Sequence, residues 1–175
     1  KEVVDWDTQG SVSHYVSTAA ELEAKANAAT EDITIAIGAD ITGDVMLVEK
    51  PDVHVTINGN RYKYDGQIKI HNNSDYNTGA VTIKNVNFVN NNDEEISFVE
   101  MNSTDGAVRY AHNVTIEACT FTGGKNSVAA KFRQSHNITI KDCAVVSGHS
   151  LAQFYGCENI LIEGTTVNAD RGVSF

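Results

Sequence analysis

The sequence has a single proline, only three cysteines and few basic residues, and it contains no long run of apolar residues. The scarcity of proline excludes collagen-like and proline-rich linker proteins. No apolar run approaches the roughly 20 residues that a membrane-spanning helix needs. Lysine and arginine total 13 against 23 acidic residues, and the net charge of −10 excludes a basic nucleic-acid-binding protein. The cysteines form neither a disulfide framework nor a CxxC metal pattern.

What the sequence does have is a repeat within 175 residues of soluble, globular composition. A nine-residue pattern such as Asn-Val-Thr-Ile-Glu-Ala-Cys-Thr-Phe returns without gaps at 80–88, 113–121, 137–145 and 159–167, with a fainter copy at 53–60. Its apolar residues alternate with threonine or charged residues, which is typical of a β-strand. A second apolar segment precedes the next copy of the pattern, at 127–132, 150–154 and 172–175.

This periodicity predicts an all-β fold, a right-handed single-stranded parallel β-helix of about five or six rungs. In such a coil, equivalent residues of successive rungs stack about 4.8 Å apart. The fourth position then gives an interior column of Ile83, Ile116, Ile140 and Ile162. The fifth position gives an outward column in which charge alternates, namely Lys84, Glu117, Lys141 and Glu163. The first position gives asparagines suited to a left-handed turn, Asn113, Asn137 and Asn159, whose amides can bond to one another.

The ends of the sequence differ from the repeats. Residues 1–32 are expected to form an N-terminal segment with a capping helix over 19–29, because strong helix formers follow a capping-box pair, Thr18 and Glu21. Residues 33–175 are expected to form the rungs, with strands at 33–37 and 45–48 and a polar, acidic insertion at 90–105. No lid follows the last strand, so we expect the rungs to continue beyond Phe175, or the open rung to support end-to-end or trimeric association.

The repeat, together with the leading stretch Val-Ser-Thr-Ala-Ala-Glu-Leu (16–22), resembles the parallel β-helix of the pectate-lyase-like superfamily, in particular its secreted and cell-surface members. The resemblance covers about residues 33–175. It implies a fold rather than an activity, because that superfamily includes polysaccharide lyases, glycoside hydrolases, phage tailspikes and non-catalytic adhesins. Lyases of the family bind calcium through outward carboxylates. Here each outward glutamate has a lysine neighbour, so we predict no metal site and no cofactor.

Two sets of side chains are candidates for binding or chemistry. His112 and His136 precede the asparagines of consecutive rungs and should stack, with Arg109 and Arg133 three positions earlier; together they form either an acid/base or anionic-sugar site, or a structural column of turn residues. Tyr62 and Tyr64, beside Arg61, should share one face, where they either stack on sugar rings or cover the first rungs.

The cysteines Cys119 and Cys143 should also stack in consecutive rungs, and we expect buried free thiols in preference to a disulfide.

The sequence therefore favours a non-catalytic extracellular or cell-surface segment of a larger protein, acting as an adhesin-like scaffold or as a recognition module for carbohydrate or another host surface ligand. The alternative is a polysaccharide-degrading enzyme, either a lyase or a glycoside hydrolase, or a tailspike-like glycan depolymerase. Its catalytic residues would be those of the histidine and arginine set, or would lie beyond the last residue.

Overall fold

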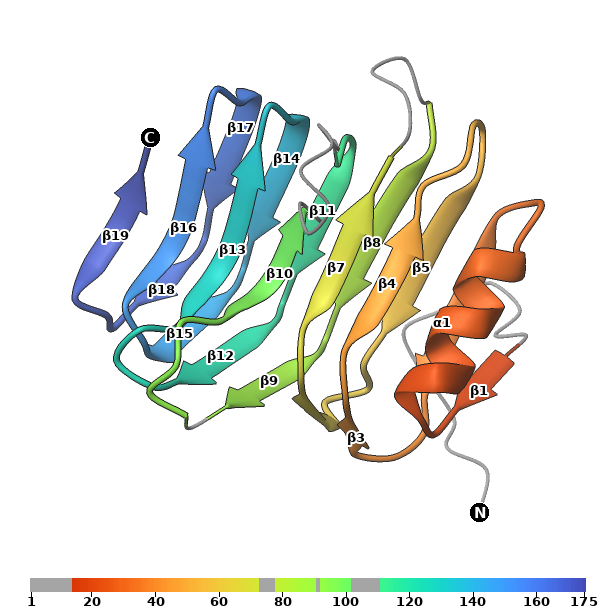
Figure 1. Ribbon diagram of the computed structural model, residues 1–175, viewed down its shortest axis with the longest axis horizontal. Coiled ribbons are helices and arrows are strands. Elements are labelled where there is room, and N and C mark those ends of the chain that lie inside the picture. The colour runs from red at the N-terminus through yellow and green to blue at the C-terminus, as the bar shows by residue number, and fades with distance from the viewer. Residues whose placement is uncertain (1–13, 73–77, 91, 102–110) are drawn as a thin grey trace.

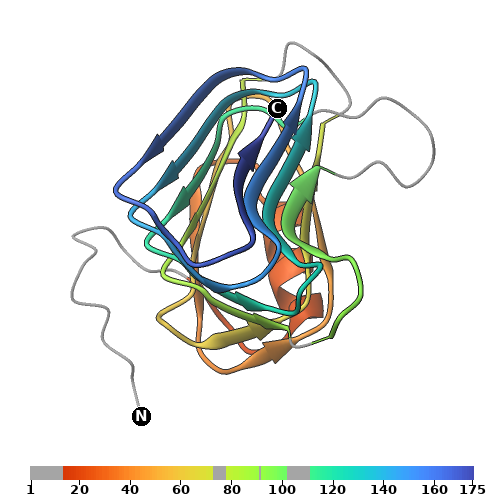
Figure 2. The ribbon, with the colours of Figure 1, turned by 90° about the vertical axis from the view of Figure 1, so that its left-hand side faces the viewer.

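The structure is a computed structural model that describes residues 14–72, 78–90, 92–101 and 111–175. The chain coils through strand after strand into a single-stranded parallel β-helix, with a helix at its N-terminal end (Figure 1). Viewed along the coil, the rungs enclose a flattened interior between the sheets (Figure 2). The all-β fold class predicted from the repeat and the N-terminal helix predicted from the capping box are confirmed.

The elements have the following bounds: β1 His14–Val16, α1 Ala19–Ala28, β2 Ile33–Ile37, β3 Ile41–Thr42, β4 Val45–Val48, β5 His54–Asn58, β6 Lys63–Asp65, β7 Ile68–His71, β8 Ala80–Lys84, β9 Asn87–Asn90, β10 Ser97–Met101, β11 Val114–Glu117, β12 Thr120–Gly123, β13 Val128–Arg133, β14 His136–Lys141, β15 Ala144–Ser147, β16 Ser150–Tyr155, β17 Glu158–Glu163, β18 Thr166–Val167 and β19 Arg171–Ser174.

Within the described residues, the strands form three parallel sheets, and each rung contributes one strand to each sheet. Sheet A has the order β1-β2-β5-β8-β11-β14-β17, sheet B has β3-β6-β9-β12-β15-β18, and sheet C has β4-β7-β10-β13-β16-β19. The nine-residue pattern spans the strands of sheets A and B. Ile83 pairs in register with Ile116, and Ile116 with Ile140. Ile140 in turn pairs with Ile162, so the predicted isoleucine column is confirmed.

Aromatic rings fill the interior beside sheet B. Tyr64, Phe88 and Phe121 are in register. The rings of Phe88 and Phe121 stack with centroids 5.1 Å apart, and Phe98 of sheet C packs against both. Each of these side chains is buried, and the Tyr64 hydroxyl donates a hydrogen bond to the carbonyl of Gly43 at 3.0 Å. Large aromatic rings from sheets B and C therefore fill the middle of the interior.

Asparagines hold one corner of the coil in the left-handed conformation that the sequence predicts. Asn113, Asn137 and Asn159 have φ angles of 56°, 60° and 55°. The side-chain amide of Asn137 donates to Asn113 Oδ1 at 2.8 Å, and that of Asn159 donates to Asn137 Oδ1 at 3.2 Å. Asparagine tolerates positive φ better than other non-glycine residues, and here its side chain also ties neighbouring rungs together.

Helix α1 covers the first edge of sheet C, where β4 has a neighbouring strand on only one side among the described residues. Thr18 caps the helix by accepting a hydrogen bond from Glu21 N, while Leu22 and Ala26 are buried in the core. The Asn27 side chain mimics a neighbouring strand: its Nδ2 donates to Met46 O at 2.7 Å and its Oδ1 accepts from Val48 N at 2.9 Å. The helix thus satisfies edge groups that would otherwise invite pairing with another chain.

We expect Asn27→Leu to lower the free energy of unfolding by about 2 kcal/mol, because it leaves a partly buried carbonyl and a partly buried amide without partners. Chemical denaturation measures the loss. Asn168→Leu is the matched control, since the Asn168 amide also bonds a carbonyl of the preceding rung, but in an exposed position. Equal losses in the two variants would contradict the role assigned to Asn27.

The polar, acidic insertion expected at 90–105 contains a strand, β10, because the apolar side chains among residues 97–101 continue the columns of sheet C. Asp93, Glu94 and Glu95 are exposed. In the last rung, Leu161, Val167 and Phe175 are exposed. Association through that rung stays a prediction. Among the described residues, no helix has the length and apolar character required to span a membrane.

Candidate functional site: a groove on sheet C

An open groove of about 360 Å³ lies on the outer side of sheet C. It is lined by Glu95, Asn126, Val128, His149 and Gln153. These side chains offer a carboxylate, two carboxamides and an imidazole around one apolar residue. Such a mixture of hydrogen-bond donors and acceptors suits a ligand rich in hydroxyl groups.

Register places three further functional groups beside the groove, where they form a square with Gln153. On β13, Lys131 and Arg133 both point outward, and they pair in register with Gln153 and Tyr155 of β16. The Arg133 guanidinium lies 5.0 Å from the centre of the Tyr155 ring, a cation–π contact that orients the ring. Tyr155 is 43% exposed, so part of its face is open to a ligand.

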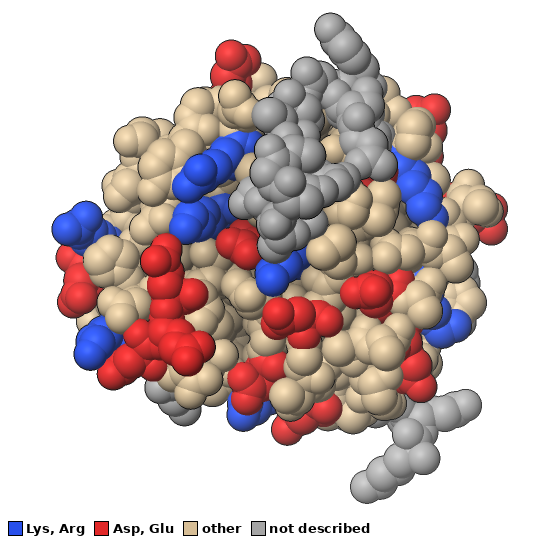
Figure 3. All heavy atoms as spheres, viewed as in Figure 1, with Lys and Arg blue, Asp and Glu red and all other residues tan. Residues whose placement is uncertain are grey.

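The groove exists because the chain bends sharply between sheets B and C. The loop before β10 carries Glu95, whose carboxylate forms an ion pair with Lys131 at 3.1 Å. The turns before β13 and β16 carry Asn126 and His149, and the Asn126 amide donates to Asp93 O. Figure 3 views the molecule from this side and shows acidic side chains gathered over the lower half of the view, with a contiguous acidic patch at the lower left and basic side chains above it and at the edges. The surface is therefore polar and carries both charges.

His112 and His136 stack as the sequence predicts, with ring centroids 3.5 Å apart and planes inclined by 12°. His112, however, is only 1% exposed, and its Nδ1 accepts a hydrogen bond from the backbone amide of His136 at 3.1 Å. A neutral His112 therefore carries its proton on Nε2. An imidazole in this position holds two rungs together and does not face a polymer in solvent.

Glu49 anchors the same corner from two rungs away. Glu49 is 6% exposed, and its Oε2 accepts hydrogen bonds from Asn72 Nδ2 at 3.1 Å and from His112 N at 3.2 Å. Burial raises the pKa of Glu49 to about 8, although the two hydrogen bonds act in the opposite direction. The side chain is therefore mostly protonated at neutral pH. It joins residues 63 positions apart in the sequence.

The remaining predicted site residues form no second site in the part of the chain that the structure describes. Tyr64 is fully buried, which excludes it as a surface for sugar stacking and fits the alternative that the two tyrosines cover the first rungs. The reason is that β6 alternates with Lys63 and Asp65 outward and the tyrosine inward. Tyr62 is half-buried against the core and Arg61 is exposed at a left-handed turn. Arg109 lies outside the described residues, and Arg133 contacts Tyr155 instead.

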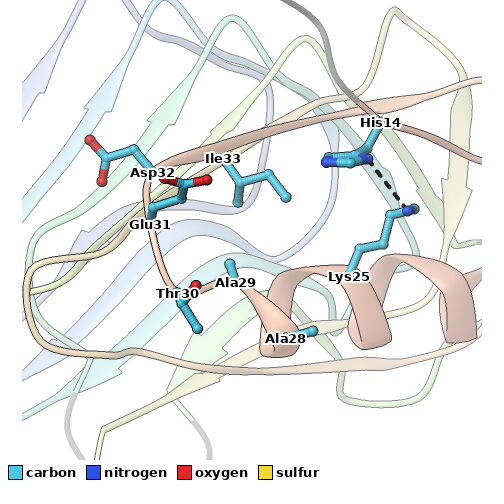
Figure 4. Close-up of a pocket in the computed structure, with 8 residues that line it drawn as sticks. All are labelled: His14, Lys25, Ala28, Ala29, Thr30, Glu31, Asp32 and Ile33. Atoms are coloured by element: carbon cyan, nitrogen blue, oxygen red, sulfur yellow. Dashed lines mark hydrogen bonds between the residues drawn. The ribbon is translucent and has the colours of Figure 1, made fainter.

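A second groove of about 310 Å³ lies at the N-terminal end, between α1 and the start of β2 (Figure 4). His14 and Lys25 face each other across one side, at 3.5 Å between Nδ1 and Nζ. Glu31 and Asp32 lie on the other side, with Ile33 between the two groups. Asp32 already accepts a hydrogen bond from His54 N. This groove lacks an exposed aromatic ring among its lining residues, in contrast to the region beside the groove on sheet C.

The cysteines and the acidic residues give no further site. Cys119 and Cys143 are buried free thiols in consecutive rungs, as expected, and each donates to the carbonyl two residues earlier. Burial raises the pKa of Cys119. A search of the described part of the chain finds no group of three or more histidine, cysteine, aspartate or glutamate residues that could hold a metal ion.

Most residues of the groove escaped the sequence analysis, although the repeat held a signal for them. Asn126 and His149 directly precede the second apolar segments at 127–132 and 150–154. Comparison of the chain with family models, with curated proteins and with solved structures finds no match in any of the three.

Proposed function

We propose that this chain is a non-catalytic recognition module that binds a polysaccharide on the outer side of sheet C. Within the proposal, the chain works outside the cell or at its surface, where such polymers occur, and it belongs to the pectate-lyase-like group of β-helix proteins. The observation that carries the proposal is the pairing of a polar groove with an exposed, oriented aromatic ring.

The chemistry of the surface supports a sugar polymer as the ligand. Sugars present hydroxyl groups to carboxamides and carboxylates, and an apolar ring face to aromatic side chains. Gln153 connects the groove to the exposed ring, since it lines the groove and its Oε1 accepts a hydrogen bond from the Tyr155 hydroxyl at 3.4 Å. Because β13 and β16 are rigidly paired, the groups are held in place before any ligand arrives.

The polysaccharide-cleaving alternative has less support. Its candidate acid/base pair was His112 and His136, but His112 is buried and its Nδ1 is engaged by the neighbouring backbone. A general acid or base must reach the proton that it transfers, either directly or through one water. The pair is better explained as part of the corner that Glu49 anchors.

The binding proposal predicts that Tyr155→Ala weakens binding about ten-fold, because a sugar ring loses its stacking surface. The measurement is affinity electrophoresis in gels that contain one polysaccharide each: polygalacturonate, alginate, a β-1,3-glucan or xylan. Gln153→Ala should weaken binding to the same polymer.

Tyr15→Ala is the matched control, since Tyr15 is similarly exposed, at 49%, but lies at the N-terminal end on β1. That variant should migrate like the unaltered protein. The proposal fails if none of the four polymers retards the protein, or if Tyr155→Ala and Tyr15→Ala bind equally well.

A further inference from the structure

The outer face of sheet A carries three straight columns of side chains over β8, β11, β14 and β17. The middle column is Thr82, Thr115, Thr139 and Leu161. On one side of it lies the charge column, which consists of Lys84, Glu117, Lys141 and Glu163. On the other side lie Ala80 and the asparagines of the corner. This face is separate from the groove on sheet C.

The charge column is only partly neutralised within the chain. Lys141 and Glu117, in the middle, form an ion pair at 3.0 Å. Within the described residues, Lys84 and Glu163, at the two ends, have no ion-pair partner within 4.0 Å, and Glu163 is exposed. Leu161, next to Glu163, is a large apolar side chain that is also exposed. The ends of the column are therefore free to pair with another molecule.

From this pattern we infer that the outer face of sheet A binds a second copy of the same chain. A two-fold axis that lies between the molecules, parallel to the strands and midway between β11 and β14, reverses the order of the rungs. The charges then read lysine, glutamate, lysine, glutamate on one copy, against glutamate, lysine, glutamate, lysine on the other. Lys84 faces Glu163 of the second copy at both ends, and Glu117 faces Lys141 in the middle.

Only this axis makes the two faces complementary. An axis along the coil would place the charge column of one copy over the asparagine corner of the other, and four charges would lose water without gaining a partner. With the axis parallel to the strands, threonine faces threonine in the middle column, and each Leu161 packs beside a Thr82 methyl group. A two-fold interface of this kind is self-complementary and closes after two copies.

The area of the face determines how strong a dimer we expect. Four strands about 4.8 Å apart and at most six residues long cover on the order of 400 Å², about half of what one partner of a standard interface buries. We therefore expect a weak dimer that forms at high protein concentration and depends on salt, because its charges stay near solvent.

Sedimentation equilibrium of the whole chain, at protein concentrations up to about 1 mM, tests the dimer with a charge swap. Lys84→Glu and Glu163→Lys, each made singly, place like charges opposite each other across the axis and should raise the dimer dissociation constant at least ten-fold. The double variant Lys84→Glu/Glu163→Lys restores both pairs between copies. It should dimerise within about three-fold of the unaltered chain.

The swap separates association from folding. Within one molecule, the double variant sets like charges on neighbouring rungs at both ends of the column, so it cannot recover dimerisation by repairing the monomer. Circular dichroism checks that all variants are folded. The inference is overturned if the unaltered chain is monomeric throughout the concentration range, if dimers form without sensitivity to either single change, or if the double variant associates no better than the singles.

Discussion

Phe88→Ala is expected to lower the free energy of unfolding by about 3 to 5 kcal/mol, among the largest losses that a single substitution can cause in this protein. The ring has no exposure to solvent and contacts Tyr64, Phe98 and Phe121, so its removal opens a cavity bounded by both neighbouring rungs and by sheet C. Thermal and urea unfolding measure the loss.

The matched control for this cavity is Phe175→Ala. Phe175 also contacts another ring, that of Phe154 at 5.8 Å, but it is 85% exposed. We expect a loss below about 1 kcal/mol for the control. Because rungs of a solenoid are stabilised by their neighbours, the Phe88 variant should unfold with reduced cooperativity as well. A loss for Phe88→Ala no larger than that for Phe175→Ala would contradict the packing described above.

The interior of this fold could be predicted from the sequence because equivalent positions in successive rungs hold similar residues. Ile83, Ile116 and Ile140 align by spacing alone, and their register in sheet A follows. The same holds for the alternating charges and for the asparagine corner. In these places the local pattern and the fold require the same residue, so one period of sequence is enough to predict the next.

The corners were harder to predict than the strands. The sequence left open whether Tyr64 stacks on sugars or covers the first rungs, because the fainter first copy of the repeat did not extend to β6. Only the register with Phe88 shows that its ring is interior. His112 was correctly paired with His136, but its burial depends on Glu49, which is far away in the sequence. Contacts between rungs that are two turns apart leave no periodic signal.

The candidate site was harder still, because it depends on irregular turns. Glu95 comes from the one stretch that breaks the period, whereas Asn126 and His149 come from turns of different sequence. A repeat determines which strand residues face outward, but the path of each turn determines whether outward residues enclose a groove. The sequence therefore identified the scaffold of the groove without its lining.

Glu49→Gln is expected to change how stability depends on pH. The pKa of Glu49 is about 8 in the folded protein against 4.5 for an ordinary glutamate. The folded state holds the proton more tightly than the unfolded state. The contribution of protonated Glu49 to the free energy of unfolding is therefore complete below pH 4.5, falls as pH rises to 8, and changes no further above that pH. The folded protein should lose up to roughly 4 to 5 kcal/mol over this interval, at about 1.4 kcal/mol per pH unit.

Glutamine keeps the shape of a protonated glutamate, and its Oε1 can still accept the hydrogen bonds from Asn72 and His112 N. It cannot ionise. Urea unfolding is measured from pH 5 to pH 9. The free energy of unfolding of the variant should rise relative to that of the unaltered protein at each step up to about pH 8. The other titrating groups, including Glu100, whose pKa burial also raises, are common to both proteins and cancel in the difference.

Glu31→Gln is the control for a glutamate that is exposed to solvent, and it should leave the pH profile unchanged. Parallel profiles for Glu49→Gln and the unaltered protein would contradict the burial of a protonated carboxyl group at this corner. A variant that gains stability above pH 6 would show that Glu49 costs the fold free energy at neutral pH. That cost follows from placing a carboxyl group where the backbone amide of His112 needs an acceptor and where solvent cannot stabilise its charge.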